Sequence, residues 1–275
     1  MIDFTKYEAG QHRLVCEECG RGAKDKTLGI KIETDGSGVA HCFRCGYAES
    51  HHPDHRSVRR PTIKPDRKPD VQQHTSLNEW GRALWASCIP LSGVAVEYLK
   101  ARHCCIPPLY GDLRWHPALK HPSGYIGPCL VALITDVETN EPLSLHRTWI
   151  TPTGKADVTP QRLLLANHSI EGGCIRLTPN DEVNAILGIA EGIETALSLA
   201  WAPLPVWATI DAGHLAKFPV LDGIRTLVIA QDQDPAGIAA AMTCAARWVT
   251  SAKEVFVTRQ AANDLNDVLA EVANV

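Results

Sequence analysis

Long apolar runs are absent from this sequence. No stretch approaches the ~18 residues that a membrane-spanning helix requires, and the opening Met-Ile-Asp-Phe-Thr-Lys-Tyr-Glu lacks the basic and then apolar order of a secretory signal. A phosphate-binding loop of the Gly-x-x-x-x-Gly-Lys-[Ser/Thr] type is absent as well, and no long period recurs. These absences exclude a membrane-spanning chain, a P-loop motor and a repeat architecture, and we expect a protein of the cytosol.

Charged residues are not abundant, and the two signs are unevenly placed. The 275 residues are 45% hydrophobic and 21% charged with a formal net charge of −4, which is typical of a folded globular protein. Residues 180–275 hold 5 Lys and Arg against 12 Asp and Glu, a net charge of −7, and the rest of the chain is at +3. The basic N-terminal part and the acidic C-terminal part of the chain therefore indicate regions with different functions.

Two closely spaced cysteine pairs stand near the start of the chain. Cys16 and Cys19 form one Cys-x-x-Cys pair, Cys42 and Cys45 form the other, and 22 residues separate the pairs. Each pair places two thiolates on one turn, so the four together complete a tetrahedral Zn²⁺ shell. The spacing predicts a zinc ribbon with a structural Zn²⁺, because a module of about 50 residues buries too little apolar surface to fold unaided.

The remaining candidate ligands have no common spacing. We expect the histidines near the ribbon to be surface residues, and we assign no role to the other six cysteines, which behave as small apolar side chains in a reducing compartment. These residues are His12, His41, His51, His52 and His55, and Cys88, Cys104, Cys105, Cys129, Cys174 and Cys244.

A proline-rich basic stretch follows the ribbon at residues 51–75. Its bases outnumber its acids and it has almost no apolar content, which is typical of an extended linker that also touches phosphate. Helical patterns then begin after Ser76 and Ser92, which we expect to be N-caps, and a hairpin is expected around Asn140 and Glu141. We expect an α+β segment at residues 76–180.

Strands and helices alternate from residue 181 onward. Strands are expected at residues 185–190, 206–210, 226–230 and 255–258, with helices at 193–201, near 215, at 236–249 and at 265–272. This alternation is typical of a parallel sheet covered on both faces. The predicted fold class is therefore multidomain α/β, with a ribbon at residues 1–50, a linker at 51–75, an α+β segment at 76–180 and a Rossmann-like parallel sheet at 181–275.

Three acids follow apolar strands of this last part. Glu191 comes after one strand, and Asp232 and Asp234 come after another, each followed by glycine or proline and a helix start. Strand ends of open α/β sheets bind ligands, and clustered carboxylates stay ionised only beside a cation. Oxygen ligands favour Mg²⁺ or Mn²⁺. Helix capping accounts for Asp234 but leaves Glu191 unexplained.

These motifs carry a resemblance. Glu191-Gly-x-x-Glu194-Thr-Ala-Leu with Asp232-x-Asp234-x-x-Gly237 resembles the Toprim domain of primases, topoisomerases and some nucleases. With the four-cysteine ribbon in front, the chain resembles phage and mobile-element DNA primases of the DnaG-like Toprim type. The segment from His146 to Lys155 and the Asp264-Leu-Asn-Asp267 sequence are similar to these proteins as well.

The resemblance implies a Mg²⁺-dependent nucleotidyltransferase that makes short RNA primers on single-stranded DNA from ribonucleoside triphosphates. Glu191, Asp232 and Asp234 would be catalytic and would bind Mg²⁺ with support from Glu194. A replicative helicase would act as a separate partner, in the cytoplasm of a bacterial host and without a membrane. Basic residues would contact phosphate or template, and our candidates are Arg44, Arg114, Arg147, Lys155 and Arg162.

Two other functions use the same residues. A Toprim nuclease would cleave a phosphodiester with the same three acids, whereas a topoisomerase would need a nucleophilic tyrosine and gate domains that 275 residues hardly accommodate. A recombination mediator similar to RecR would clamp DNA without catalysis. The intact acidic set and the long segment between ribbon and Toprim motif favour the primase.

Overall fold

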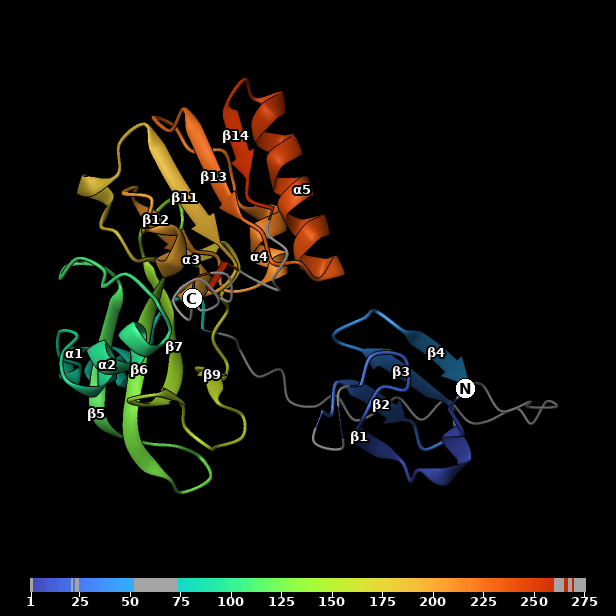
Figure 1. Cartoon of the computed structure of the whole chain (residues 1–275). Helices are drawn as coiled ribbons and strands as arrows, with labels where there is room; N and C mark the ends of the chain where they lie inside the picture. Colours follow the sequence, from blue (N-terminus) through green and yellow to red (C-terminus); the bar gives the residue numbers. More distant parts are fainter. Residues whose placement is uncertain are drawn as a thin grey trace. The chain divides into compact units, whose positions relative to one another are not determined.

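The computed structural model describes residues 2–20, 22, 25–51, 74–259, 265, 266 and 269. The chain divides into two compact units, residues 1–69 and 70–275, which are described separately (Figure 1). Nearly all of the expected linker, together with Asp264, Asp267 and most of the expected last helix, lies outside the described residues. In the part of the chain that is described, no helix is long and apolar enough to cross a membrane.

The first unit is built on an antiparallel sheet with one buried face. Leu28, Ile30 and Ile32 alternate inward on the second strand and pack against Phe4, which lies in a short 3-10 helix at Phe4–Lys6. This period of two is the expected signal of a strand with one apolar face. The sheet order is β1 (Gly10–Leu14), β2 (Leu28–Ile32), β3 (Gly38–Cys42) and β4 (Ala48–His51).

The second unit opens with two short helices and a long hairpin. The hairpin strands are paired from Cys129 opposite Trp149 to Ile134 opposite Ser144, which confirms the hairpin expected around Asn140. Asn140 has a φ of 63°, so the turn uses the left-handed conformation that asparagine tolerates. The elements are α1 (Glu79–Ser87), α2 (Val94–Ala101), β5 (Leu113–Lys120), β6 (Ile126–Asp136), β7 (Pro142–Thr151), β8 (Gly154–Lys155) and β9 (Arg162–Leu164).

The two expected helix caps were wrong. The side chain of Asn78, rather than Ser76, accepts the N–H of Gly81 at 2.8 Å and caps α1. Helix α2 begins after Gly93 without a side-chain cap, and the hydroxyl of Ser92 instead accepts the indole N–H of Trp115 at 3.3 Å. Asparagine is as good a cap as serine, and a serine bound to a tertiary partner no longer serves its own helix.

A parallel sheet follows, as the strand–helix alternation predicts. Its strands run in the order β14, β13, β11, β12, and in-register pairs such as Ile189 with Ile229 tie the central two. In this part of the unit, the red and orange end of Figure 1, α5 lies alongside β13 and β14. The elements are β11 (Ile186–Ala190), α3 (Ile193–Leu199), β12 (Val206–Ala208), α4 (Ala212–Lys217), β13 (Thr226–Ala230), α5 (Pro235–Thr250) and β14 (Glu254–Val257).

Helices cover both faces of this sheet. Leu187 and Ile189 of β11 pack with α4 and α5 in one core, whereas Ala190 packs with α2 and α3 in another. The alternation follows from the pleat, which sends successive side chains to opposite faces. Each face is thus fully apolar, as parallel strands require.

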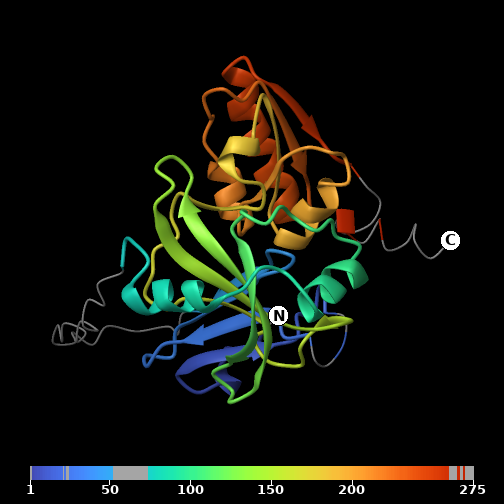
Figure 2. The same cartoon turned by 90° about the vertical axis from the view of Figure 1, so that its left-hand side faces the viewer.

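One sheet runs through both halves of the second unit. Strand β10 (Gly173–Arg176) pairs antiparallel with β12 on one side and with β6 on the other, so the parallel strands and the hairpin form a single ten-stranded sheet. Figure 2, turned by 90°, shows the green hairpin continuing toward the orange and red elements. The sequence did not indicate this joint, because a local pattern does not show which distant strands β10 pairs with.

Candidate functional site

The four cysteines of the first unit lie together. Their sulfur atoms are all within 4.8 Å of one another, with Cys16 and Cys45 at 3.7 Å and Cys19 and Cys42 at 3.5 Å. A tetrahedral Zn²⁺ with bonds of about 2.3 Å sets its sulfurs roughly 3.8 Å apart. The spacing and the all-thiolate chemistry therefore fit a structural Zn²⁺.

Backbone groups prepare this cluster for a cation. Burial opposes ionisation of Cys42, but N–H groups of Cys45 and Arg44 hydrogen bond to its sulfur and lower the pKa of the thiol to about 6. Gly46 turns with a φ of 74°. Gly20 is needed for a different reason, since a Cβ there would lie 2.5 Å from the carbonyl oxygen of Cys16.

Arg44, one of the predicted nucleic-acid contacts, is held within the ribbon. Its guanidinium donates to both carboxylate oxygens of Asp25, one of them at 2.8 Å, and to the carbonyl of Cys19 at 3.3 Å. The neighbouring Phe43 is 63% exposed, and the guanidinium of Arg13 lies 4.3 Å from its ring centre. Of Phe43 and Arg44, Phe43 is therefore the side chain that faces solvent.

In the second unit, acidic residues follow three adjacent parallel strands. Glu191 comes directly after β11, Asp211 lies just beyond β12, and Asp232 follows β13 by two residues. Carboxyl ends of parallel strands meet at one edge, so these side chains share it. Asp211 was missed in the sequence, although it follows an apolar strand in the same way as Glu191.

Asp234, at the same edge, also caps a helix. Its Oδ1 accepts the N–H of Gly237 at 2.7 Å, which caps α5, and Pro235 occupies the first turn. Gly237 is required because a Cβ would lie 2.9 Å from the carbonyl oxygen and Cβ of Asp232. The tight turn brings the two aspartates and the helix start together.

The acids at this edge repel one another. Burial raises the pKa of Glu191 to about 7, and the charges of Asp232, Asp234 and Asp211 add to the effect. Among the described residues, only the cysteines gather three or more ligand atoms within 4.8 Å, so one ion held by these carboxylates requires them to rotate inward. The oxygen donors and their mutual repulsion fit a hard divalent cation.

A cavity of about 240 Å³ adjoins the acids. Glu191 and Asp232 line it, and so do three cationic side chains from the middle segment. The cations are Arg102 from the end of α2, Lys155 from β8 and Arg162 from β9. A cavity lined by both carboxylates and cations suits a polyphosphate that carries a divalent cation.

Lys155 and Arg162 were predicted from sequence, and both line this cavity. Arg114 instead lies 4.4 Å from the ring centre of Trp85, and Arg147 donates to the carbonyl of Leu164 at 2.9 Å. Neither of these arginines lines the cavity. Arg102 was missed, because nothing in the sequence connects the end of α2 with the later strands.

His146 also lines the cavity and stays neutral. Burial, together with the charges of Arg162 and Lys155, lowers its pKa to about 4. Its Nδ1 is buried, and no hydrogen-bond partner for it is found within residues 74–259 or elsewhere in the described chain. A neutral imidazole near cationic side chains offers a hydrogen bond without another positive charge.

Glu194, the fourth predicted Mg²⁺ ligand, lies beside two of the cationic side chains. Its Oε2 is 3.1 Å from Nζ of Lys155 and 3.5 Å from Nη2 of Arg102, and its Oε1 accepts the hydroxyl of Tyr98. Burial alone would raise the pKa of Glu194, but these three partners hold it below its ordinary value. Glu194 is therefore ionised and surrounded by donors.

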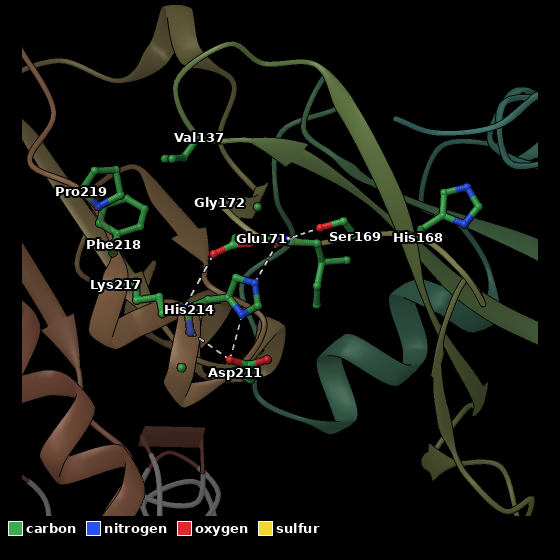
Figure 3. Close-up of a pocket in the computed structure, with 13 residues that line it drawn as sticks. Val137, His168, Ser169, Glu171, Gly172, Asp211, His214, Lys217, Phe218 and Pro219 are labelled. Carbon is green, nitrogen blue, oxygen red and sulfur yellow. Dashed lines mark hydrogen bonds and ion pairs between the residues drawn. The ribbon is translucent and has the colours of Figure 1, made fainter. Parts of the chain in front are cut away.

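A second cavity, of about 420 Å³, lies next to the acidic edge. Figure 3 shows its polar side, where the ring of His214 lies between Asp211 and the 168–173 loop. His214 Nδ1 is 2.8 Å from Asp211 Oδ1, and Nε2 is 2.7 Å from the carbonyl oxygen of Ile170. Asp211 thus contributes charge both to this cavity and to the surroundings of Glu191.

Two family profiles match the second unit. Residues 75–177 match a family described as Domain of unknown function (DUF7146), and residues 186–274 match the Toprim domain. No curated protein sequence matches the chain. The Toprim match covers β11 to β14 and includes Glu191, Asp211, Asp232 and Asp234.

Solved primase structures are among the similar folds. The primase fragment of the bacteriophage T7 primase-helicase is 15% identical over 95% of both chains, with a TM-score of 0.45. The zinc-binding and RNA polymerase domains of the Aquifex aeolicus primase are 13% identical over 98% of this chain and 80% of that one, with a TM-score of 0.46. A DNA primase domain from Pseudomonas aeruginosa is 14% identical over 71% and 74%, with a TM-score of 0.41.

The predicted fold class is confirmed: a four-cysteine module comes first, a central segment follows, and a mixed sheet with a parallel part ends the chain. The matched family also confirms what the acidic motifs indicated. Residues 186–274 form a Toprim domain, preceded in the chain by a domain of unknown function at residues 75–177.

Proposed function

We propose that this protein is a DNA primase, which synthesises short RNA primers on single-stranded DNA by Mg²⁺-dependent nucleotidyl transfer. One observation carries the proposal: the cavity at the strand ends of the Toprim domain is lined by the carboxylates of Glu191 and Asp232 and also by three cationic side chains. Joining nucleotides requires neutralising a triphosphate and orienting a hydroxyl toward it, and the two groups of side chains suit that task.

In this proposal Glu191, Asp232 and Asp234 hold Mg²⁺ or Mn²⁺ and are the catalytic residues. The ion, when bound, supplies Lewis-acid stabilisation of the phosphate charge. Lys155 and Arg162 contact the phosphates, since both already line the cavity. Arg114, Arg147 and Arg44 stay predictions for contacts with the template backbone.

Glu191 is suited to move a proton in this reaction. Its carboxylate directly follows β11, beside the proposed ion, and can accept the proton of an attacking 3′-hydroxyl there. Asp234 instead is held at the start of α5 by the hydrogen bond between its Oδ1 and the N–H of Gly237, which suits a carboxylate that anchors the ion. In this proposal Glu191, after β11, is the general base, and Asp232 and Asp234, after β13, anchor the ion.

The first unit takes the template in this proposal. Its four cysteines hold Zn²⁺ as a structural ion, and the exposed Phe43 offers a ring on which a base can stack. A replicative helicase acts as a separate partner, and the reaction takes place in the cytoplasm of a bacterial host. The proposed division is a ribbon at 1–50, a linker at 51–75, an α+β segment at 76–180 and a Toprim domain at 181–275.

The test is a primer synthesis assay with single-stranded templates of random sequence, labelled ribonucleotides and Mg²⁺. Short RNA products that require template and disappear with EDTA support the proposal. Shortened template would instead identify a Toprim nuclease. A mobility shift without products or cleavage would identify a mediator similar to RecR.

A further inference from the structure

Two glutamates three residues apart differ sharply in their surroundings. Glu191 ends β11 and is surrounded by acids, whose charges disfavour its ionisation. Glu194 lies in the first turn of α3 and is surrounded by donors, with Lys155 and Arg102 at 3.1 and 3.5 Å from one carboxylate oxygen. The charges around Glu191 therefore favour a cation beside it, whereas Glu194 already has two cationic neighbours.

The second carboxylate oxygen of Glu194 is occupied as well. Tyr98 of α2 is fully buried, and its hydroxyl donates to Oε1. A carboxylate offers about four lone-pair sites over its two oxygens. Tyr98 and Lys155 donate hydrogen bonds to them, and the guanidinium of Arg102 lies 3.5 Å from Oε2. A dication on this carboxylate would stand beside two cationic groups, which repel it.

We propose that Glu194 is a positioning residue rather than a Mg²⁺ ligand: it fixes Lys155 and Arg102 in the cavity wall as one anion-binding pair for the polyphosphate of a nucleoside triphosphate. This inference rests on the proposed function, in which that cavity receives the triphosphate. It departs from the role that the acidic motif suggested for Glu194.

The two cations need such an anchor. Lys155 ends a strand of only two residues, and Arg102 follows the last turn of α2, so neither backbone fixes the long side chain. Flexible side chains lose conformational entropy when they bind an anion, unless something has already ordered them. Tyr98 orders Glu194, and Glu194 in turn orders both cations.

Mn²⁺ binding separates the two roles. In the nucleotide-free full-length protein, titrations followed by the free Mn²⁺ EPR signal should give Glu194→Gln an affinity within twofold of the wild type. Glu191→Gln should lose at least tenfold, because it removes a carboxylate from the acidic edge. Glu97→Gln, on the exposed face of α2, is the matched control. A tenfold loss in Glu194→Gln would overturn the proposal.

Anion binding tests the positioning step without changing any charge. Tyr98→Phe removes one hydrogen bond to Glu194, so the affinity for inorganic triphosphate in metal-free buffer should fall three- to fivefold by calorimetry. Tyr110→Phe, at an 87% exposed tyrosine, should not change it. In a Lys155→Met background the effect of Tyr98→Phe should shrink to below twofold, because Lys155 is the closer of the two cations that Glu194 holds.

An equal effect of Tyr98→Phe with and without Lys155 would overturn the proposal, since a general packing defect acts independently of that side chain. Unchanged triphosphate affinity in Tyr98→Phe would overturn it as well. Circular dichroism and thermal melting confirm that each variant folds. Both readouts are binding measurements, so a failure of primer synthesis would refute the proposed function while leaving the role of Glu194 to be decided by these two titrations.

Discussion

Asp211 and His214 form an ion pair that caps a helix and lines the cavity of about 420 Å³. The carboxylate of Asp211 accepts the backbone N–H of His214 at 2.9 Å and its Nδ1 at 2.8 Å, at the start of α4. The same carboxylate is one of the acids that raise the pKa of Glu191. One side chain thus stabilises α4 and contributes charge at the candidate metal site.

Because of this pair, we expect the free energy of unfolding to depend on pH. The hydrogen bond to Asp211 raises the pKa of His214 above its ordinary value, in spite of partial burial. The stabilisation is complete below the unfolded pKa of about 6.5 and is lost as pH rises through the folded value. His214→Gln should therefore lower the melting temperature more at pH 5.5 than at pH 9, by about 2–4 °C for each kcal/mol. His116→Gln, away from the pair, should lack this difference.

For Glu191 we expect the opposite pH dependence: replacing it should raise the melting temperature, and more so at high pH. Its pKa is raised to about 7, so the ionised form destabilises the metal-free fold as pH rises from the unfolded value of about 4.3 through 7. Glu191→Gln should melt above the wild type at pH 8, and the difference should disappear only near pH 4, where the glutamate is protonated in both the folded and the unfolded state. A wild type that melts above the variant at pH 8 in EDTA would contradict the prediction. Glu138→Gln, at an exposed site, is the control.

Asp232→Asn should separate catalysis from folding. The variant removes one of the charges that raise the pKa of Glu191, so the metal-free protein should melt no lower than the wild type. Primer synthesis should fall by about a hundredfold or more, which is the usual cost of losing one preorganised electrostatic group. Gel analysis of labelled products measures this, with Asp222→Asn as the control. Full synthesis by the variant would remove Asp232 from the active site.

Zinc content tests the cysteine cluster. The wild type should contain about one equivalent of zinc by mass spectrometry of the metal, and Cys42→Ser should contain far less, because one of four thiolates is lost. Initiation of primers should fall with it. Cys105→Ser lies outside the cluster and should retain the metal. An unchanged zinc content in Cys42→Ser would show that the four sulfurs do not hold the ion.

The acidic edge could be predicted from sequence because local patterns determine it. An apolar strand followed by an acid and a helix start places Glu191 and Asp232 at a strand end wherever the rest of the chain lies. Asp211 follows β12 in the same pattern, so the same reasoning could have identified it from the sequence. The four cysteines are likewise determined by spacing alone.

The cationic lining of the cavity could not be predicted in full, because its members come from distant elements. Arg102 ends α2, Lys155 lies in β8, and the two meet only through Glu194 of α3. Sequence spacing carries no signal for such a meeting. Arg114 and Lys155 look alike as isolated bases, yet one packs on Trp85 and the other lines the cavity.

The shared sheet limits how this chain can be divided. Strand β12 of the Toprim domain gives one of its edges to β10, which in turn pairs with the β6–β7 hairpin. A fragment that begins at residue 186 would expose that edge and part of a buried core, and exposed strand edges promote aggregation. Such a fragment should therefore be less soluble than the whole unit of residues 70–275.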